Sequence, residues 1–411
     1  TDGGKTFKKI NKENVHADHH IVWIDPARDS HLIIGNDGGC NITYDNGDHW
    51  FKANSPAVAQ FYSVFTDNAH PYNVYGGLQD NGVWYGPSNN TENVAWQDNG
   101  NYPFKPIMGG DGMQVQVDTR DNLTAYTGFQ FGNYSRVNRL SPGETAKRIT
   151  PQHLLGEKPY RFNWQTPVLI SRFNQDVIYF GGNKLFRSFN KGDTMVALGK
   201  DLTNGGIPGN VPYGTITTIS ESPMRFGLLY VGTDDGNIQI SKDGGYTWSL
   251  INAKENKAIS KIFKQGLWVS RVLASKYNEA TVYVTLSGYR NDDFNSYVFV
   301  SEDYGSTWKR IGLNLPSEPV NVIREDPTNN QIIYVGTDGG LYVSFDKGES
   351  FMYWNAGMPK GVSVHDIAIQ EKENEIVIGT HGRSIYIARL EDIQGLQKDK
   401  DWLKKKPKEK S

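Results

Sequence analysis

A short pattern of the form Ser/Thr-x-Asp-x-Gly-x-x-aromatic recurs along the chain and constrains its fold more than any other feature. Clear copies begin at Thr43, Ser241, Ser301 and Ser344, and a copy with Asn in place of Asp begins at Ser188. In such a sequence the carboxylate accepts backbone N–H groups, the Gly supplies a positive φ, and the aromatic side chain returns to the core. The pattern therefore predicts a hairpin turn, in which we assign a structural role to Asp2, Asp45, Asp243, Asp303 and Asp346.

An apolar run with a glycine-rich end recurs together with this turn, as in residues 31–39, 228–236 and 332–340. Runs of four or five apolar residues are typical of buried strands, and glycine-rich ends are typical of tight turns. Eight such units begin near residues 16, 60, 110, 164, 214, 268, 320 and 364. Their spacing of roughly 40 to 60 residues is that of a propeller blade. We therefore expect an all-β propeller of four-stranded blades, with seven blades and a partial unit.

The turn pattern also suggests domain limits. Residues 2–7 match it from its third position onward, so the chain is expected to begin inside a repeat. We expect residues 1–15 to end a preceding blade and residues 16–390 to form the propeller. Residues 391–411 are expected to form a short helical segment and a lysine-rich tail, and such charge runs are usually solvated.

Composition excludes several classes of protein. The formal net charge of −2 gives no global field of the kind that gathers nucleic acid. The chain has one cysteine, Cys40, so an internal disulfide is excluded, and no apolar stretch reaches the 18 or so residues of a membrane helix. We expect neither nucleic acid nor a membrane span among its interactions, and we expect no cofactor.

The repeats resemble those of BNR/Asp-box propellers. The resemblance is closer to large bacterial proteins described as sortilin (VPS10)-like or BNR-repeat glycosyl-hydrolase-like, and it covers almost the whole chain. Its most specific pieces are residues 16–20, 76–82, 109–112, 232–236 and 379–384. In this group two propellers commonly occur in tandem, and in xyloglucanases similar folds face each other across a cleft. The resemblance thus implies a C-terminal propeller whose partner is an N-terminal propeller missing from this chain, and an exported protein that is periplasmic, outer-membrane-associated or secreted.

The resemblance specifies fold better than function, because these propellers include sialidases, xyloglucan hydrolases, sorting receptors and photosystem assembly factors. A single cysteine excludes the Cys-rich modules of sortilin receptors, and the sialidase arginine triad has no counterpart in this sequence. We hypothesise a protein-, peptide- or glycan-binding scaffold in a cell-surface or periplasmic assembly. The alternative is a glycoside hydrolase of two-propeller, xyloglucanase-like architecture, so whether the chain is an enzyme stays open.

A histidine-rich cluster opens the first unit. On a strand, alternation would send His16, Asp18 and His20 to one face and His19 to the other. Two imidazoles and a carboxylate on one face suit a divalent metal or a ligand. A third interpretation is that these residues line the channel and bond to water or to backbone groups. We assign no metal to them.

Two carboxylates lie in segments that depart from the ordinary blade pattern, Asp80 and Asp111. Glycoside hydrolysis needs two carboxyl groups about 5 to 9.5 Å apart, so these two are the candidates for a catalytic pair. An Asp beside Gly also stabilises its own turn, which is the competing explanation.

Further candidates for ligand contact lie in the last unit, where Arg383 suits bidentate binding of an anion or a peptide carboxylate. A structural ion pair would explain the same residues. The full set of predicted ligand-binding residues is His16, Asp18, His20, Gln79, Asp80, Asp111, His365, Asp366, His381 and Arg383.

Overall fold

The computed structural model describes residues 3–12, 14–53, 57–91, 102–253, 256–355 and 357–398. Asp2, which we assign to a turn, and residues 399–411 of the lysine-rich tail lie outside the described residues. Among the described helices, none combines the length and the apolar character needed to cross a membrane.

By their contacts the residues form two compact units, Thr1–Ala59 and Gln60–Ser411. The first unit contains one antiparallel sheet, which corresponds to the sequence unit that begins near residue 16. Its strands, in order, are β1 (His19–Asp25), β2 (Arg28–Asn36), β3 (Gly39–Thr43) and β4 (Phe51–Ala53). The predicted domain limits of 1–15, 16–390 and 391–411 stay a prediction.

In the second unit the described residues form seven antiparallel sheets, each built from strands consecutive in sequence. The first three sheets are β5 (Phe61–Thr66), β6 (Asn73–Leu78), β7 (Gly82–Pro87) and β8 (Lys105–Met108); β9 (Gly112–Val117), β10 (Thr124–Phe129), β11 (Asn133–Asn138) and β12 (Lys147–Arg148); and β13 (Val168–Ile170), β14 (Ile178–Gly181), β15 (Leu185–Ser188) and β16 (Val196–Leu198).

The next three sheets also have four strands, and the last has three. They are β17 (Ile216–Glu221), β18 (Leu229–Thr233), β19 (Ile238–Ser241) and β20 (Ser249–Leu250); β21 (Trp268–Ala274), β22 (Val282–Gly288), β23 (Asp293–Ser301) and β24 (Lys309–Ile311); β25 (Val320–Glu325), β26 (Ile333–Thr337), β27 (Gly340–Ser344) and β28 (Met352–Trp354); and β29 (Val364–Gln370), β30 (Glu375–Thr380) and β31 (Ile385–Arg389). Short helices α2 (Pro142–Thr145), α3 (Lys257–Ser260) and α4 (Leu390–Leu396) and the 3-10 turn η1 (Tyr289–Asn291) lie between or after the strands.

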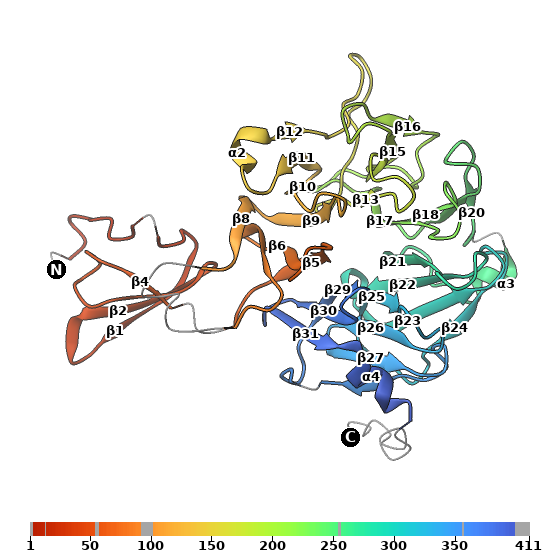
Figure 1. The fold of residues 1–411 in the computed structure, drawn as a ribbon. Helices are drawn as coiled ribbons and strands as arrows, with labels where there is room; N and C mark the ends of the chain where they lie inside the picture. The colour runs from red at the N-terminus through yellow and green to blue at the C-terminus, as the bar shows by residue number, and fades with distance from the viewer. Residues whose placement is uncertain are drawn as a thin grey trace. The chain divides into compact units, whose positions relative to one another are not determined.

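The last sheet of this unit packs against the first. Strand β29 lies beside β5, the Val64 amide donates to Asp366 Oδ2 at 3.2 Å, and Gln60 pairs with His381 in an isolated bridge. The first strand of each sheet lies toward the centre of the unit (Figure 1). These sheets thus have the radial arrangement of a propeller, and the predicted fold class is confirmed; the number of blades stays a prediction.

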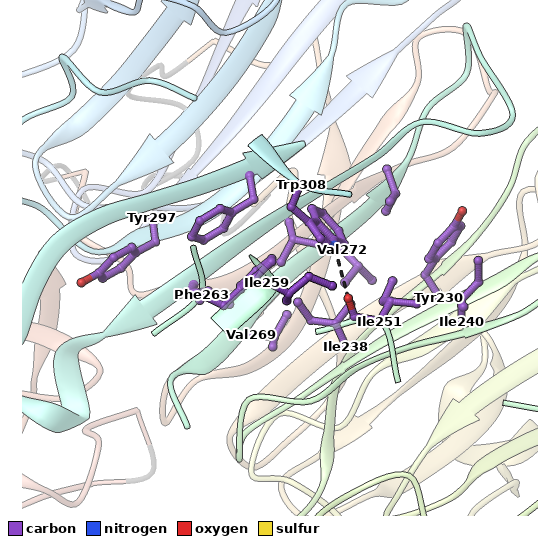
Figure 2. Packing of buried hydrophobic residues seen from close by; sticks show 14 of the residues in the cluster. Tyr230, Ile238, Ile240, Ile251, Ile259, Phe263, Val269, Val272, Tyr297 and Trp308 are labelled. Carbon is purple, nitrogen blue, oxygen red and sulfur yellow. Dashed lines mark hydrogen bonds between the residues drawn. The ribbon is translucent and has the colours of Figure 1, made fainter. Parts of the chain in front are cut away.

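The hydrophobic core lies between neighbouring sheets, because each sheet buries side chains on both of its faces. Figure 2 shows the cluster between the β17–β20 and β21–β24 sheets. Its labelled members are Tyr230, Ile238, Ile240, Ile251, Ile259, Phe263, Val269, Val272, Tyr297 and Trp308. Trp308 is the aromatic residue of a turn copy, and its indole N–H donates to the Ile251 carbonyl at 3.1 Å. The recurring turn therefore attaches the outer strand of one sheet to the sheet before it.

Within the turn that begins at Ser301, the Asp303 carboxylate bonds its own hairpin. Its Oδ1 accepts the Ser301 hydroxyl and the Thr307 amide, both at 2.8 Å, and its Oδ2 accepts the Thr307 hydroxyl at 2.6 Å. Gly305 has a φ of 86° and donates its amide to the Ser301 hydroxyl oxygen at 2.8 Å. The copies at Asp45, Asp243 and Asp346 make equivalent bonds.

Replacing Asp303 with Ala is expected to lower the free energy of unfolding by about 1 kcal/mol, as for other side-chain caps. Burial raises the pKa of Asp303, but the bonds from Thr307 and Ser301 outweigh it, so the pKa lies below the usual 3.8. The contribution is therefore complete above about pH 3.8 and is lost as the pH falls through the lowered pKa. Urea unfolding at pH 7 and at acid pH measures it, with exposed Glu302→Ala as the control. Lost ligand binding with unchanged stability would contradict the structural assignment.

Candidate functional site

The first strands of the second unit carry a shared irregularity. In five of them the pairing with the second strand skips one residue, as expected for a β-bulge, which re-aims the extra side chain. The skipped residues are Tyr62, Thr217, Ser270, Asn321 and His365. All five line one cavity of about 180 Å³, so the bulges bring residues far apart in sequence to one place.

The cavity is polar, with two indole rings. Its other lining residues are Gln114, Asn163, Trp164, Gln165, Trp268, Arg271, Ser287 and Arg290. Arg290 lies over the Trp268 ring, with its guanidinium carbon 4.1 Å from the ring centroid. Burial lowers the pKa of Arg290, although Asp234 acts against this shift. The wall therefore offers stacking surfaces, hydrogen-bonding groups and positive charge together.

Some of the bulged side chains join neighbouring sheets. The Thr217 hydroxyl donates to the Val269 carbonyl at 2.6 Å, and the Ser270 hydroxyl donates to the Val320 carbonyl at 2.6 Å. The Asn321 amide donates to the next first strand in the same way. These bonds hold the ring of sheets together, so ligand contact falls to the longer side chains of the cavity.

Two predicted histidines stack beside this cavity. The rings of His365 and His381 lie 4.3 Å apart at an interplanar angle of 11°. Burial and the neighbouring His381 lower the pKa of His365 to about 4, and burial lowers the pKa of His381. Both rings are therefore neutral near pH 7 and can act as hydrogen-bonding groups rather than as cations.

Asp366 follows His365 but points between the sheets. Its Oδ1 accepts Arg271 at 2.9 Å and Arg324 at 3.1 Å, and its side chain is 6% exposed. Burial and the positive charge of Arg271 lower the pKa of Arg324 to about 10. Asp366 thus supports the cavity wall through two guanidinium groups, and these contacts favour a structural role over the predicted ligand contact.

Arg383 lies in the turn after β30. Its amide donates to the Thr380 hydroxyl oxygen at 3.0 Å, its side chain is exposed, and it is not among the described residues that line the cavity. Its predicted contact with a ligand stays a prediction for the surface outside the cavity.

The predicted carboxylate pair is brought together. Gln79 Nε2 donates to Asp80 Oδ1 at 3.1 Å and to Asp111 Oδ1 at 2.8 Å, and the Asp80 amide donates to Asp111 Oδ1 at 2.9 Å. Gln79 in turn accepts the Tyr62 hydroxyl, whose oxygen accepts the Trp164 indole at 3.1 Å. The pair is therefore connected to the cavity through Gln79 and Tyr62.

Burial raises the pKa of Asp111, and the negative charge of Asp80 adds to this shift. A carboxyl group with a raised pKa is suited to the acid role in such a pair. Because both Oδ1 atoms bond the same nitrogen, they lie closer together than the roughly 6.5–9.5 Å of an inverting glycosidase. As arranged, the pair leaves no room for the attacking water of that mechanism.

Glycines permit the close approach of β6 and β7 to the start of β9. A Cβ on Gly77 would lie 1.9 Å from the Met113 carbonyl oxygen, and one on Gly112 would lie 2.0 Å from the Gly82 carbonyl oxygen. Only glycine fits where one backbone crosses another so closely. The glycine-rich departures at residues 76–82 and 109–112 therefore position Asp80 and Asp111.

The histidine-rich cluster lies in the first unit. Strand β1 begins only at His19 and skips His20 in its pairing, so His16 and Asp18 precede the strand. The predicted alternation over residues 16–20 is therefore wrong, because the segment is not extended strand throughout. A bulge at His20 nevertheless repeats the irregularity of the second unit.

Sequence reasoning missed several residues of the cavity and one of the histidine cluster. Those in the cavity are Tyr62, Gln114, Asn163, Trp164, Gln165, Thr217, Trp268, Ser270, Arg271, Ser287, Arg290 and Asn321, and the one in the cluster is Asp37. Superposing the repeats on their apolar runs would align Thr217, Ser270 and Asn321 as polar residues just inside a buried strand. That alignment is the available signal.

Comparison with known proteins agrees with this fold. The family model Sortilin-Vps10, described as "Sortilin, neurotensin receptor 3", matches residues 296–395. A xyloglucanase of Hypocrea jecorina (strain QM6a) is 26% identical over 180 residues, which are 41% of this chain and 20% of that protein. The GH74 xyloglucanase from Xanthomonas campestris superposes with a TM-score of 0.58 at 16% identity, over 81% of this chain and 52% of that one.

The chain thus spans only about half of the solved relative and a fifth of the curated one. The similarity to the solved structure concerns the fold, whereas the two sequence matches connect the chain with sortilin-type and xyloglucanase-type propellers. The resemblance to BNR-type propellers of the sortilin-like, glycosyl-hydrolase-like kind is confirmed.

Proposed function

We propose that the chain is a binding propeller that holds part of a peptide, protein or glycan ligand in the central cavity of its second unit. The observation that carries the proposal is the Arg290 guanidinium on the cavity wall. It is stacked on Trp268 and forms no salt bridge with a described residue. The Arg290 side chain is exposed, so an anion that enters the cavity can reach the guanidinium group and accept charge-assisted hydrogen bonds from it.

The chemistry of the wall limits the ligand. Arg271 uses its terminal nitrogen on Asp366, whereas its Nε is buried without a hydrogen-bond partner among the described residues. Trp164 and Trp268 offer flat surfaces on which sugar rings or peptide side chains stack. A volume of about 180 Å³ is small beside the roughly 300–1,000 Å³ of sites for whole small molecules. We infer that the cavity takes the acidic end group of a larger ligand.

The proposal includes a partner for the first unit. On β1, Ile21, Val22, Trp23 and Ile24 are each about half exposed or more, whereas corresponding apolar strands such as β25 and β29 are largely buried between sheets. Apolar side chains exposed on both faces of a strand suit burial between further sheets. We propose an N-terminal propeller as the source of those sheets, and an exported location as the resemblance implies.

Binding by the complete chain tests the function. Calorimetric titration with uronic-acid oligosaccharides, neutral xyloglucan oligosaccharides and peptides with a free C-terminal carboxylate is expected to show binding of an acidic class. Arg290→Ala is expected to weaken that binding roughly 10- to 100-fold, because a charge-assisted hydrogen bond contributes about 1.5–3 kcal/mol. Arg172→Ala is the control, since Arg172 is 61% exposed and lies outside the cavity. Equal affinity in the two variants would contradict the proposal.

A hydrolase is the second candidate, favoured by the Asp80–Asp111 pair and by the similarity to a xyloglucanase. The same preparations assayed for release of reducing ends from xyloglucan distinguish the two functions. Turnover by this chain that disappears in Asp111→Asn would establish the hydrolase, whereas binding without turnover supports the scaffold.

A further inference from the structure

A compact group of metal-ligand side chains lies in the first unit. His16, Asp18 and Asp37 each offer one ligand atom, and these atoms all lie within 4.8 Å of one another. His16 Nδ1 is 3.8 Å from Asp18 Oδ2. We propose that these three residues bind a divalent transition-metal ion of the Zn²⁺ type, with His20 positioning one of the ligands.

The backbone around the group is held by local bonds. The Asp37 amide donates to the Asp18 carbonyl at 3.2 Å, which joins the segment before β1 to the turn after β2. The Gly38 amide donates to Asn36 Oδ1 at 3.0 Å, and Asn36 donates to the buried Asn41 at 3.0 Å. The turn that carries Asp37 is therefore ordered by the chain itself.

Gly38 allows His16 to lie close to the turn that carries Asp37. A Cβ at this position would lie 2.7 Å from the His16 Cβ, which real side chains do not tolerate. Any other residue would push the imidazole away from the two carboxylates. The position after Asp37 therefore requires glycine for a second reason besides turn formation, namely the close approach of His16.

The distances suit closure around an ion. Ligand atoms about 2.0–2.2 Å from a tetrahedral Zn²⁺ are roughly 3.3–3.6 Å apart, so the group must contract by about 1 Å. Asp18 is 67% exposed at its side chain, so its carboxylate can rotate toward the other two ligands. The three ligands would leave a fourth position for water or a ligand group.

His20 supports the site rather than completing it. Its Nε2 lies 2.6 Å from Asp37 Oδ1, and carboxylates that bind metals are commonly oriented by such a partner. The bulge in β1 that leaves His20 unpaired aims this ring at Asp37. His19, the neighbouring residue in β1, is not among the ligands.

The donor set decides the class of metal. An imidazole nitrogen with two carboxylates suits Zn²⁺ and its first-row neighbours, whereas Ca²⁺ and Mg²⁺ prefer oxygen ligands throughout. The second His–Asp pair of this unit supplies a comparison, since His49 Nδ1 lies 2.7 Å from Asp45 Oδ2 within a turn copy. No third ligand lies close enough to that pair among the described residues, so His49 and Asp45 should not bind the ion.

Metal binding to the full chain tests the proposal. After removal of metals with a chelator, calorimetric titration with Zn²⁺ is expected to show one strong site, and Ca²⁺ is expected to bind at least tenfold more weakly. His16→Ala and Asp37→Asn should each weaken Zn²⁺ binding at least tenfold, and His20→Ala should weaken it about tenfold. His49→Ala should bind as the parent chain does.

Thermal unfolding makes the result independent of folding defects. The metal-free variants are expected to melt with the metal-free parent, because the altered side chains are wholly or partly exposed. Zn²⁺ should raise the melting temperature of the parent and of His49→Ala more than that of the cluster variants at the same concentration. The proposal is overturned if the parent binds Zn²⁺ no better than Ca²⁺, or if the cluster variants bind and melt as His49→Ala does.

Discussion

Replacing Gly112 with Ala is expected to lower the free energy of unfolding by about 3 kcal/mol, the upper end of the usual range for overpacking, and to separate Asp80 from Asp111. The new Cβ would lie 2.0 Å from the Gly82 carbonyl oxygen and 2.3 Å from the Gly82 carbonyl carbon. Both are backbone atoms at the start of β7, so no side-chain rotation relieves the clash. The start of β9 must therefore move away from the start of β7.

Gly109→Ala is the matched control for this substitution. Gly109 precedes Gly112 in the same glycine-rich segment, but a Cβ there would meet no atom within 4 Å, and its φ needs no glycine. Urea unfolding of both variants measures the difference. Equal stability of the two variants would show that the start of β9 does not approach the start of β7 as closely as described. The connection between these glycines and the carboxylate pair would then be contradicted.

The structure gives a physical explanation for the choice of this carboxylate pair from the sequence. Asp80 and Asp111 are selected because their segments depart from the repeat, and both segments contain glycines. In the structure those glycines allow a backbone crossing, which places both aspartates on one Gln79 side chain. Regular turn copies such as the one at Asp303 bond only within themselves and between adjacent sheets, so the pattern separates the two kinds of aspartate.

The central cavity could not be predicted in the same way, because it depends on bulges. A bulge shifts the alternation of a strand by one residue, so the inward and outward faces cannot be assigned from sequence alone. His365 enters the cavity only because β29 skips it, and the shift sends the adjacent Asp366 between the sheets. Arg290 and Trp268 are missed for another reason, since η1 and the start of β21 carry no repeated signal.

Asp366→Ala is expected to lower the free energy of unfolding by about 3–5 kcal/mol, as does removal of one partner from a buried ion pair. The substitution leaves Arg271 and Arg324 without their shared carboxylate, in a wall where Arg271 is 17% exposed. It also removes the acceptor of the Val64 amide, which joins the last sheet to the first. The effect should therefore exceed that of any single surface ion pair.

Asp392→Ala is the control, because Asp392 pairs with Arg389 at 2.9 Å on the surface and both side chains are more than half exposed. Such pairs contribute about 0–1 kcal/mol. Asp366→Asn keeps the shape and one acceptor oxygen but removes the charge, so it should fall between Ala and the parent if the two guanidinium groups need a negative partner. Unfolding in urea distinguishes a structural role of Asp366 from a ligand-binding role. A stable Asp366→Ala variant that loses ligand binding would identify Asp366 as a binding residue. A large loss of stability would identify it as the residue that joins the last sheet to the first.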